Sequence, residues 1–385
     1  MKRSNTIGFD ARYAGSGNTT LSSYARLIIE AMAEACPRRG YFRLYITDND
    51  HHAEYEALTK RHNVESMQPD GALWRRLPWL WRQWPIGRDM KRGDVDLYHS
   101  LTEELPFGLE RRNIRTVVTI HSLDFLSPYS FTNPLTSALR RLRVTSSLHR
   151  ADRIVAVSES LKADIVDKFG IDADKIDVIY RGCHPRFAEP ITADDRARVK
   201  ERYSLPAHYL LTSGRQVSRR NTSPIVEALP LLPDDLHLVI LSPATPQAER
   251  LMRRARSLGI GHRLHLIDNA AEEDIAPIYS LAEIYVLPSR YEGFATTIVE
   301  ALTAGVPVIA ARGTSLEEAG GPHSIYIDPS DPAALAESVT MILDDGELRQ
   351  AMIAHGHEFT SRFRPEVAAY NILNCYRRIG VEIDE

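Results

Sequence analysis

The chain has 385 residues, which is long for one hydrophobic core, so two domains are expected. Hydrophobic residues make up 43% of the chain and charged residues 25%, the proportions of an ordinary globular protein; the formal net charge of −4 gives no reason to expect a nucleic-acid partner. The three cysteines are scattered and lack metal-ligand spacing, which indicates reduced thiols in a cytoplasmic protein. No run approaches the roughly 18 apolar residues of a membrane span, and no apolar signal region follows the N-terminus.

The first predicted unit is a strand over residues 6–10, a loop that contains Gly15 and Gly17, and a helix capped by Thr19 or Thr20. Two glycines with Thr20 in place of the third match the dinucleotide-binding fingerprint only in part. A simple strand-to-helix turn is therefore favoured over a nicotinamide site.

All four tryptophans of the chain fall between Trp74 and Trp84, and arginines alternate with them over residues 73–92. Aromatic rings and positive charges together suit an anionic membrane surface, which predicts a peripheral contact with the cytoplasmic membrane. A helix that packs its tryptophans on the domain and leaves its arginines in water would give the same pattern. Both interpretations stay open.

Strands are also predicted over residues 41–47, 96–100, 116–121, 154–157 and 176–180. His99 and His121 fall at or near the carboxyl ends of two of them, where ligands of open α/β sheets bind. His99 is interpreted as structural, and His121 is a candidate site residue.

Residues 183–191, which include Pro185 and Pro190, are predicted to be a linker. Six further apolar runs alternate with helical stretches, the pattern of a parallel sheet covered on both faces. These predicted strands cover residues 209–213, 237–241, 263–267, 283–287, 307–310 and 324–327. The chain is thus expected to be α/β, with two unlike Rossmann-type halves.

The first strand of the second half ends at Gly214, and Arg215 and Arg220 follow. A glycine lets the backbone turn close to a ligand, and guanidinium groups can donate in bidentate fashion to diphosphate oxygens. Isolated arginines are more often solvated charges, but their place at a strand end favours a binding role.

Residues 288–293 are predicted to be the loop that follows the strand 283–287, and Thr296 or Thr297 is expected to cap the next helix. The amide groups of a helix start bind phosphate. Glu292 and Glu300 would flank that anion site and accept hydrogen bonds from sugar and ribose hydroxyls, respectively. Taken alone, two such glutamates are more often a helix-dipole partner and a solvated loop residue.

The segments Glu292-Gly293-Phe294, Glu300-Ala301-Leu302 and residues 304–310 together resemble the signature of the retaining glycosyltransferases of family 4, which have the GT-B fold. The resemblance implies two Rossmann-like domains facing across a cleft: residues 1–187 for the acceptor, residues 188–364 for the donor, and residues 365–385 as a helix that crosses back. It also implies that His121 meets the donor sugar, although Ser122 stands where the family has Asp. Arg220 stands where the family usually has Lys.

The resemblance implies a hexosyltransferase of polysaccharide or lipopolysaccharide biosynthesis, which moves a hexose, for example mannose, from a GDP- or UDP-sugar to a glycan or lipid-linked acceptor. The expected catalytic residues are His121, Arg215, Arg220 and Glu292. The expected substrate-binding residues are Gly17, Arg215, Arg220, Glu292, Gly293, Phe294, Ala295, Thr296, Thr297 and Glu300.

Two alternatives remain open: a nucleotide-sugar epimerase of the same fold and a non-catalytic subunit that binds nucleotide-sugar. No cofactor and no metal are expected. Three Asp-x-Asp pairs occur, at residues 48/50, 94/96 and 172/174, but they lie before a strand or in predicted surface turns. Fixed positive groups are expected to stabilise the leaving diphosphate instead.

Overall fold

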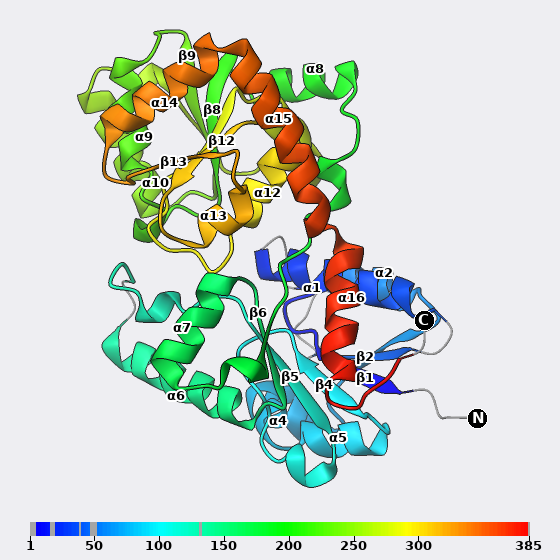
Figure 1. The fold of residues 1–385 in the computed structure, drawn as a ribbon. Helices are drawn as coiled ribbons and strands as arrows, with labels where there is room; N and C mark the ends of the chain where they lie inside the picture. The colour runs from blue at the N-terminus through cyan, green and yellow to red at the C-terminus, as the bar shows by residue number, and fades with distance from the viewer. Residues whose placement is uncertain (1–4, 16–19, 38–39, 47–51, 131–132, 384–385) are drawn as a thin grey trace. The chain divides into compact units, whose positions relative to one another are not determined.

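The computed structural model describes residues 5–15, 20–37, 40–46, 52–130 and 133–383, and it divides the chain into two compact units (Figure 1). Unit 1 comprises Met1–Phe125, Thr132–Gly182 and Pro365–Glu385; unit 2 comprises Leu126–Phe131 and Cys183–Arg364. The division after Gly182 lies five residues before the expected boundary at 187.

Unit 1 is built on a parallel sheet with the strand order β3-β2-β1-β4-β5-β6-β7 among the described residues. Its strands are β1 (Thr6–Asp10), β2 (Tyr41–Tyr45), β3 (Val64–Met67), β4 (Leu97–Ser100), β5 (Arg115–Ile120), β6 (Arg153–Ala156) and β7 (Ile176–Val178). Its helices are α1 (Thr20–Ala35), α2 (His52–Thr59), α3 (Ala72–Arg76), α4 (Pro78–Gln83), α5 (Ile86–Arg92), α6 (Pro134–Arg150), α7 (Glu159–Phe169) and α16 (Pro365–Arg377).

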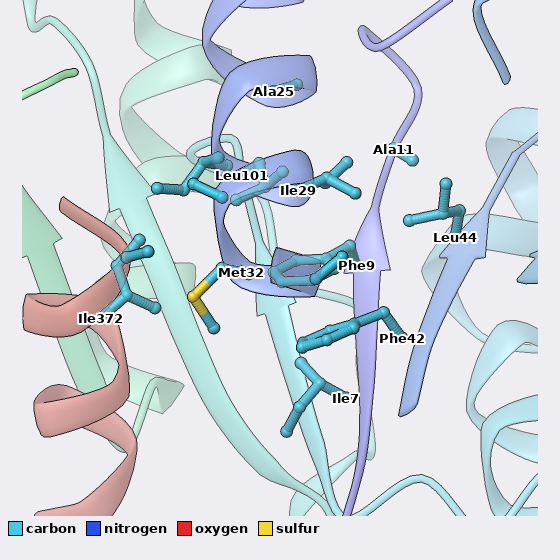
Figure 2. Close-up of a cluster of buried hydrophobic side chains, with 14 of the residues drawn as sticks. Ile7, Phe9, Ala11, Ala25, Ile29, Met32, Phe42, Leu44, Leu101 and Ile372 are labelled. Atoms are coloured by element: carbon cyan, nitrogen blue, oxygen red, sulfur yellow. The ribbon is translucent and has the colours of Figure 1, made fainter. Parts of the chain in front are cut away.

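The core of unit 1 lies between the sheet and two helices that are far apart in the sequence, α1 and α16. Phe9 of β1 stacks on Phe42 of β2 with ring centroids 5.8 Å apart, while Met32 and Ile372 approach from α1 and α16 (Figure 2). Buried strands of a parallel sheet are continuous apolar runs, which is why most of these strands are visible in the sequence. The C-terminal helix α16 therefore belongs to unit 1.

Unit 2 has a second parallel sheet, with the order β10-β9-β8-β11-β12-β13 among its described residues. Its strands are β8 (His208–Ser213), β9 (Leu236–Leu241), β10 (Leu264–Ile267), β11 (Ile284–Leu287), β12 (Val308–Ala311) and β13 (Ile325–Ile327). Its helices are α8 (Ala193–Arg202), α9 (Ser223–Ala228), α10 (Pro246–Ser257), α11 (Glu272–Ser280), α12 (Thr296–Thr303), α13 (Ser315–Gly320), α14 (Pro332–Asp344) and α15 (Gly346–Thr360).

The strand order in unit 2 places β8 beside β11 at the centre of the sheet. The chain runs from β8 outward to β10 and then returns to β11 before it continues to β13, so the order reverses between these two strands. Loops after such a pair diverge and leave room for a ligand at the carboxyl ends. The loops after β8 and β11 are the two segments that carry the predicted donor-site residues.

Candidate functional site

Two loops of unit 2, one after β8 and one after β11, are joined to each other by backbone and side-chain hydrogen bonds. The amide of Arg290 donates to the carbonyl of Arg219 at 2.8 Å. Asn221 ends a short turn in the left-handed conformation, which asparagine tolerates better than most residues, and its side chain donates to the carbonyls of Pro288 (3.2 Å) and Pro329 (2.5 Å). These contacts fix the arginines of one loop against the glutamate of the other.

Glu292 is a buried carboxylate held by two arginines and a serine. Its oxygens lie 2.5 Å from Arg219 and 3.2 Å from Arg220, and it accepts a hydrogen bond from Ser289 at 2.9 Å. Burial alone would raise the pKa of Glu292, but the positive charges of Arg220 and Arg219 outweigh it and hold the pKa below its ordinary value. The hydroxyl of Ser315 anchors the backbone carbonyl of Glu292 at 2.7 Å. Glu292 is therefore a fixed, ionised acceptor.

Arg220 lies against the backbone of Gly214. Gly214 has φ +92°, and a Cβ there would stand 2.7 Å from an Arg220 guanidinium nitrogen, so only glycine allows this approach. The Nε atom of Arg220 forms the ion pair with Glu292, whereas its Nη1 atom is buried and has no hydrogen-bond partner. A buried donor without a partner is rare in folded proteins, and here it leaves one side of the guanidinium ready to bind an anion.

Arg215 differs from Arg220 in its surroundings. It is exposed at the end of β8, and no hydrogen bond or ion pair joins its side chain to any residue that the structure describes. Its charge is thus available to an incoming ligand at the same sheet edge.

Helix α12 begins without a side-chain cap, and the prediction that Thr296 or Thr297 caps it is wrong. Ala295 holds the cap position, and its methyl group cannot accept a hydrogen bond, while both threonines are already helical. Their hydroxyl oxygens are buried and have no hydrogen-bond partner. The helix start therefore offers uncapped amides and two hydroxyls to a ligand.

Glu300, one turn into α12, has a different environment from Glu292. Tyr279 donates to its carboxylate at 3.2 Å, and Arg186 and Arg220 also lower its pKa, but burial outweighs these effects and raises the pKa to about 7. Glu300 thus accepts hydrogen bonds best above neutral pH. Gly293, Phe294 and Ala295 are buried between the two glutamates, and Phe294 packs on Phe363 with ring centroids 5.5 Å apart.

His121 follows β5 in unit 1 and is buried. Its Nε2 atom is 2.9 Å from the carbonyl of Leu101, so Nε2 carries the proton and Nδ1 is an acceptor, which is buried without a hydrogen-bond partner. Burial and the charge of Arg181 hold the pKa of His121 well below its ordinary range, so the ring is neutral. The Leu101 carbonyl holds the ring although Ser122 stands where the family has Asp.

His99 has no spare nitrogen, because its ring bonds to Tyr376 at 2.7 Å and Thr119 at 2.8 Å; its structural interpretation is confirmed. Gly17 lies outside the described residues. Among the described residues, no three His, Cys, Asp or Glu side chains gather where they could hold a metal ion. Asp96 and Asp172 accept hydrogen bonds from nearby backbone amides.

Sequence reasoning missed several residues that shape these sites. In unit 2 these are Arg219, Ser289, Ser315 and Tyr279, which hold the two glutamates. In unit 1 it missed Asp10, a buried carboxylate at the end of β1 that pairs with Arg12 at 2.5 Å. Asp10 could have been found from the sequence, because a polar residue at the carboxyl end of a buried strand often lies at a ligand site.

Two family models match the chain, and together they cover most of it. "Glycosyl transferases group 1" matches residues 194–359, and "Glycosyltransferase Family 4" matches residues 27–187. No helix in the described part of the chain has the length and apolar character needed to cross a membrane.

Among curated proteins, the chain is 28% identical over 291 residues to the O-antigen chain mannosyltransferase B of Escherichia coli, covering 73% of this chain and 74% of that protein. It is 26% identical over 241 residues to the serotype-specific mannosyltransferase WbdA of Escherichia coli, covering 61% of this chain but only 30% of WbdA. It is also 26% identical over 278 residues to a D-inositol 3-phosphate glycosyltransferase of Corynebacterium diphtheriae, covering 69% of this chain and 65% of that protein.

Solved structures share the fold along nearly the whole chain. Anabaena HepE, in complex with UDP and glucose, has a TM-score of 0.75 at 18% identity, covering 97% of this chain and 100% of that one. Sucrose-phosphate synthase from Thermosynechococcus elongatus has a TM-score of 0.78 at 21% identity, covering 97% and 99%. The predicted GT-B fold with two Rossmann-like domains is confirmed.

Proposed function

Because the chain belongs to family 4 of the glycosyltransferases, we propose that it is a retaining hexosyltransferase that moves a hexose from a nucleoside diphosphate sugar to a surface-polysaccharide or lipid-linked glycan. Mannose is the first sugar to test, because mannosyltransferases are among its relatives. The observation that supports the proposal most is a set of buried donors in unit 2 that have no hydrogen-bond partner: the Nη1 atom of Arg220 and the hydroxyls of Thr296 and Thr297.

These donors suit the diphosphate of the nucleotide-sugar. Negative charge builds on the leaving diphosphate as the glycosidic bond breaks, and fixed positive groups aimed at that charge lower the barrier. Arg220 and the uncapped start of α12 are fixed by the protein before any ligand arrives, while Arg215 supplies a second, exposed guanidinium. No metal is needed for this stabilisation.

The two glutamates would hold the two ends of the donor. Glu300 would accept hydrogen bonds from the ribose diol. Glu292 would accept from the hexose hydroxyls, because its charge is already balanced by Arg219 and Arg220, which makes it a better sugar binder than nucleophile. In unit 1, the Nδ1 atom of His121 is a further acceptor that would bind a hydroxyl group.

A screen of donors by thermal shift tests the first half of the proposal. The matching nucleotide-sugar should stabilise the protein, since a ligand at 100 times its dissociation constant adds about 2.7 kcal/mol. A matched pair of variants, Arg220→Gln in the site and Arg250→Gln on the exposed face of α10, locates the effect. The donor site would be refuted if a nucleotide-sugar stabilised both variants equally, or if no GDP- or UDP-sugar stabilised the wild type.

We also propose that unit 1 contacts an anionic membrane surface through residues 73–92. Leu73 is 60% exposed and Trp79 63% exposed, and Arg75 and Arg76 between them are also exposed. Trp81, by contrast, is 1% exposed and donates to Asp89 at 2.7 Å, so it is part of the core. Only some of the tryptophans are therefore available to a membrane.

A further inference from the structure

A hollow of about 690 Å³ lies in unit 1, in a part of the sheet that the donor chemistry does not use. It is lined chiefly by aromatic and basic side chains: Trp74, Trp84, Phe107, Arg88, Arg111 and Arg112. Pockets of a few hundred cubic ångströms with convergent charged groups are the usual form of small-molecule sites.

The hollow lies at the amino ends of β4 and β5. Helix α5 leads into β4, and Arg112 stands three residues before β5 begins, whereas His121 directly follows the end of β5. A six-residue strand alone spans roughly 17 Å. Figure 1 shows α4 and α5 grouped at one end of this sheet. The hollow is thus separate from the carboxyl ends of the strands, where His121 lies.

One wall of the hollow is a rigid aromatic surface. The rings of Trp84 and Phe107 stack with centroids 5.6 Å apart and planes 20° apart. The guanidinium of Arg150 sits 4.3 Å from the Phe107 ring centre and donates to the carbonyl of Leu105 at 2.8 Å. The amide of Phe107 also donates to the carbonyl of Gln83 at 2.8 Å. The wall is therefore in place before any ligand arrives, which reduces the entropy lost on binding.

The remaining lining is strongly cationic. No ion pair joins Arg88, Arg111 or Arg112 to a carboxylate among the residues that the structure describes, and the Nε atom of Arg112 is buried without a hydrogen-bond partner. A Cβ at position 87 would stand 3.0 Å from that Nε atom, so Gly87 lets the guanidinium lie against α5. Glu110 adds one carboxylate, which can accept hydrogen bonds from hydroxyl groups.

We propose that this hollow binds a phosphorylated sugar. The apolar face of a sugar ring would lie on Trp84 and Phe107, its phosphate would take bidentate hydrogen bonds from the arginines, and its hydroxyls would donate to Glu110. The role, which rests on the proposed glycosyltransferase function, is to hold a phosphate-bearing part of the acceptor away from the hydroxyl that reacts.

Tryptophan fluorescence gives a local test, because all four tryptophans of the chain lie between Trp74 and Trp84 and none lies in unit 2. Titration of the full-length protein with a hexose 6-phosphate should change the emission and saturate, whereas the unphosphorylated hexose and inorganic phosphate should each bind more weakly. Arg112→Gln should reduce the affinity roughly tenfold or more, the scale for loss of a hydrogen bond to a charged group. Calorimetry should show a comparable loss for Trp84→Ala.

Two exposed residues of unit 1 that lie outside the lining and outside residues 73–92 provide matched controls, Arg141→Gln on α6 and Tyr370→Ala on α16, and neither should change the affinity. Equal melting temperatures would show that the variants fold. The affinities for a free sugar phosphate and for a lipid-linked sugar phosphate, measured in the same detergent, show which of the two ligands binds more tightly.

Absence of saturable binding, or equal losses in the site and control variants, would overturn the inference. Binding of GDP or UDP measured on the same variants distinguishes the two proposals. The affinity for GDP or UDP should be unaffected by Arg112→Gln. If neither nucleotide binds, that result would count against the donor site in unit 2 and not against the hollow.

Discussion

Glu300, which we propose as the acceptor for the ribose hydroxyls, has a carboxyl pKa raised to about 7. Its carboxylate form is the better acceptor for ribose hydroxyls, so donor affinity should increase as the pH rises from about 6 to about 8. At pH 8, Glu300→Gln should weaken donor binding by roughly 1.5–3 kcal/mol and abolish this pH dependence. Calorimetric titration at several pH values measures both effects. If the affinity is unchanged in the variant, Glu300 does not bind the donor and interacts only with the helix dipole.

The same pKa makes a prediction for the ligand-free protein. The Glu300 carboxyl loses its proton near pH 4.5 when exposed to water and near pH 7 in the folded state, so the folded state binds more protons between these values. The contribution of Glu300 to the stability of the wild type should therefore fall as the pH rises through this window. Glu300→Gln removes the penalty, so its melting temperature relative to the wild type should be higher at pH 8 than at pH 5. A constant difference would contradict the raised pKa.

Arg215 supplies a charge that no described residue neutralises. If it stabilises the leaving diphosphate, Arg215→Ala should lower kcat by about two or three orders of magnitude, the scale for removing one transition-state donor. Arg250→Ala, an exposed arginine on α10 of the same unit, should leave kcat unchanged. A large rise in KM with little change in kcat would make Arg215 a residue for donor binding only.

At the scale of elements, the helices α3 to α5 divide the tryptophans between core and surface. Trp81→Ala removes a fully buried side chain and its hydrogen bond to Asp89, and it should cost about 3–5 kcal/mol of unfolding free energy. Denaturant unfolding of the variant and the wild type measures this cost. A loss within about 0.5 kcal/mol, typical of exposed positions, would be inconsistent with its burial.

Trp79 belongs to the exposed part of the same segment. Trp79→Ala should weaken co-sedimentation with anionic liposomes, and added salt should weaken binding of the wild type, because screening reduces the attraction of its arginines. Tyr370→Ala is a matched control, since Tyr370 on α16 is 53% exposed. If the wild type does not sediment with anionic liposomes at low salt, residues 73–92 have no membrane role.

For the molecule as a whole, we expect turnover without a divalent metal. In the proposed mechanism, Arg215, Arg220 and the start of α12 would supply the positive charge that a cation would otherwise bring to the diphosphate. The purified enzyme should keep its rate in excess EDTA. Loss of activity that magnesium or manganese restores would instead require a carboxylate pair as metal ligand.

Much of the fold could be predicted because most strands are continuous apolar runs with polar residues at their ends. The missed strand β3 has the sequence Val-Glu-Ser-Met, which lacks such a run. The place of α12 was predictable to within a residue or two, but its cap was not, because the usual preference for Thr at a cap favoured the wrong position. The pairing of Arg219 with Glu292 joins residues 73 positions apart, so no local pattern indicates it.

The central claim is transfer of a hexose with retention of its anomeric configuration. The most direct measurement incubates the enzyme with each nucleotide-sugar and a lipid-linked glycan acceptor, follows release of the nucleoside diphosphate, and determines the anomeric configuration of the new bond by NMR. We expect acceptor-dependent release and a product whose anomeric configuration matches that of the donor. An inverted product, or conversion of the nucleotide-sugar to an epimer without any acceptor, would contradict it.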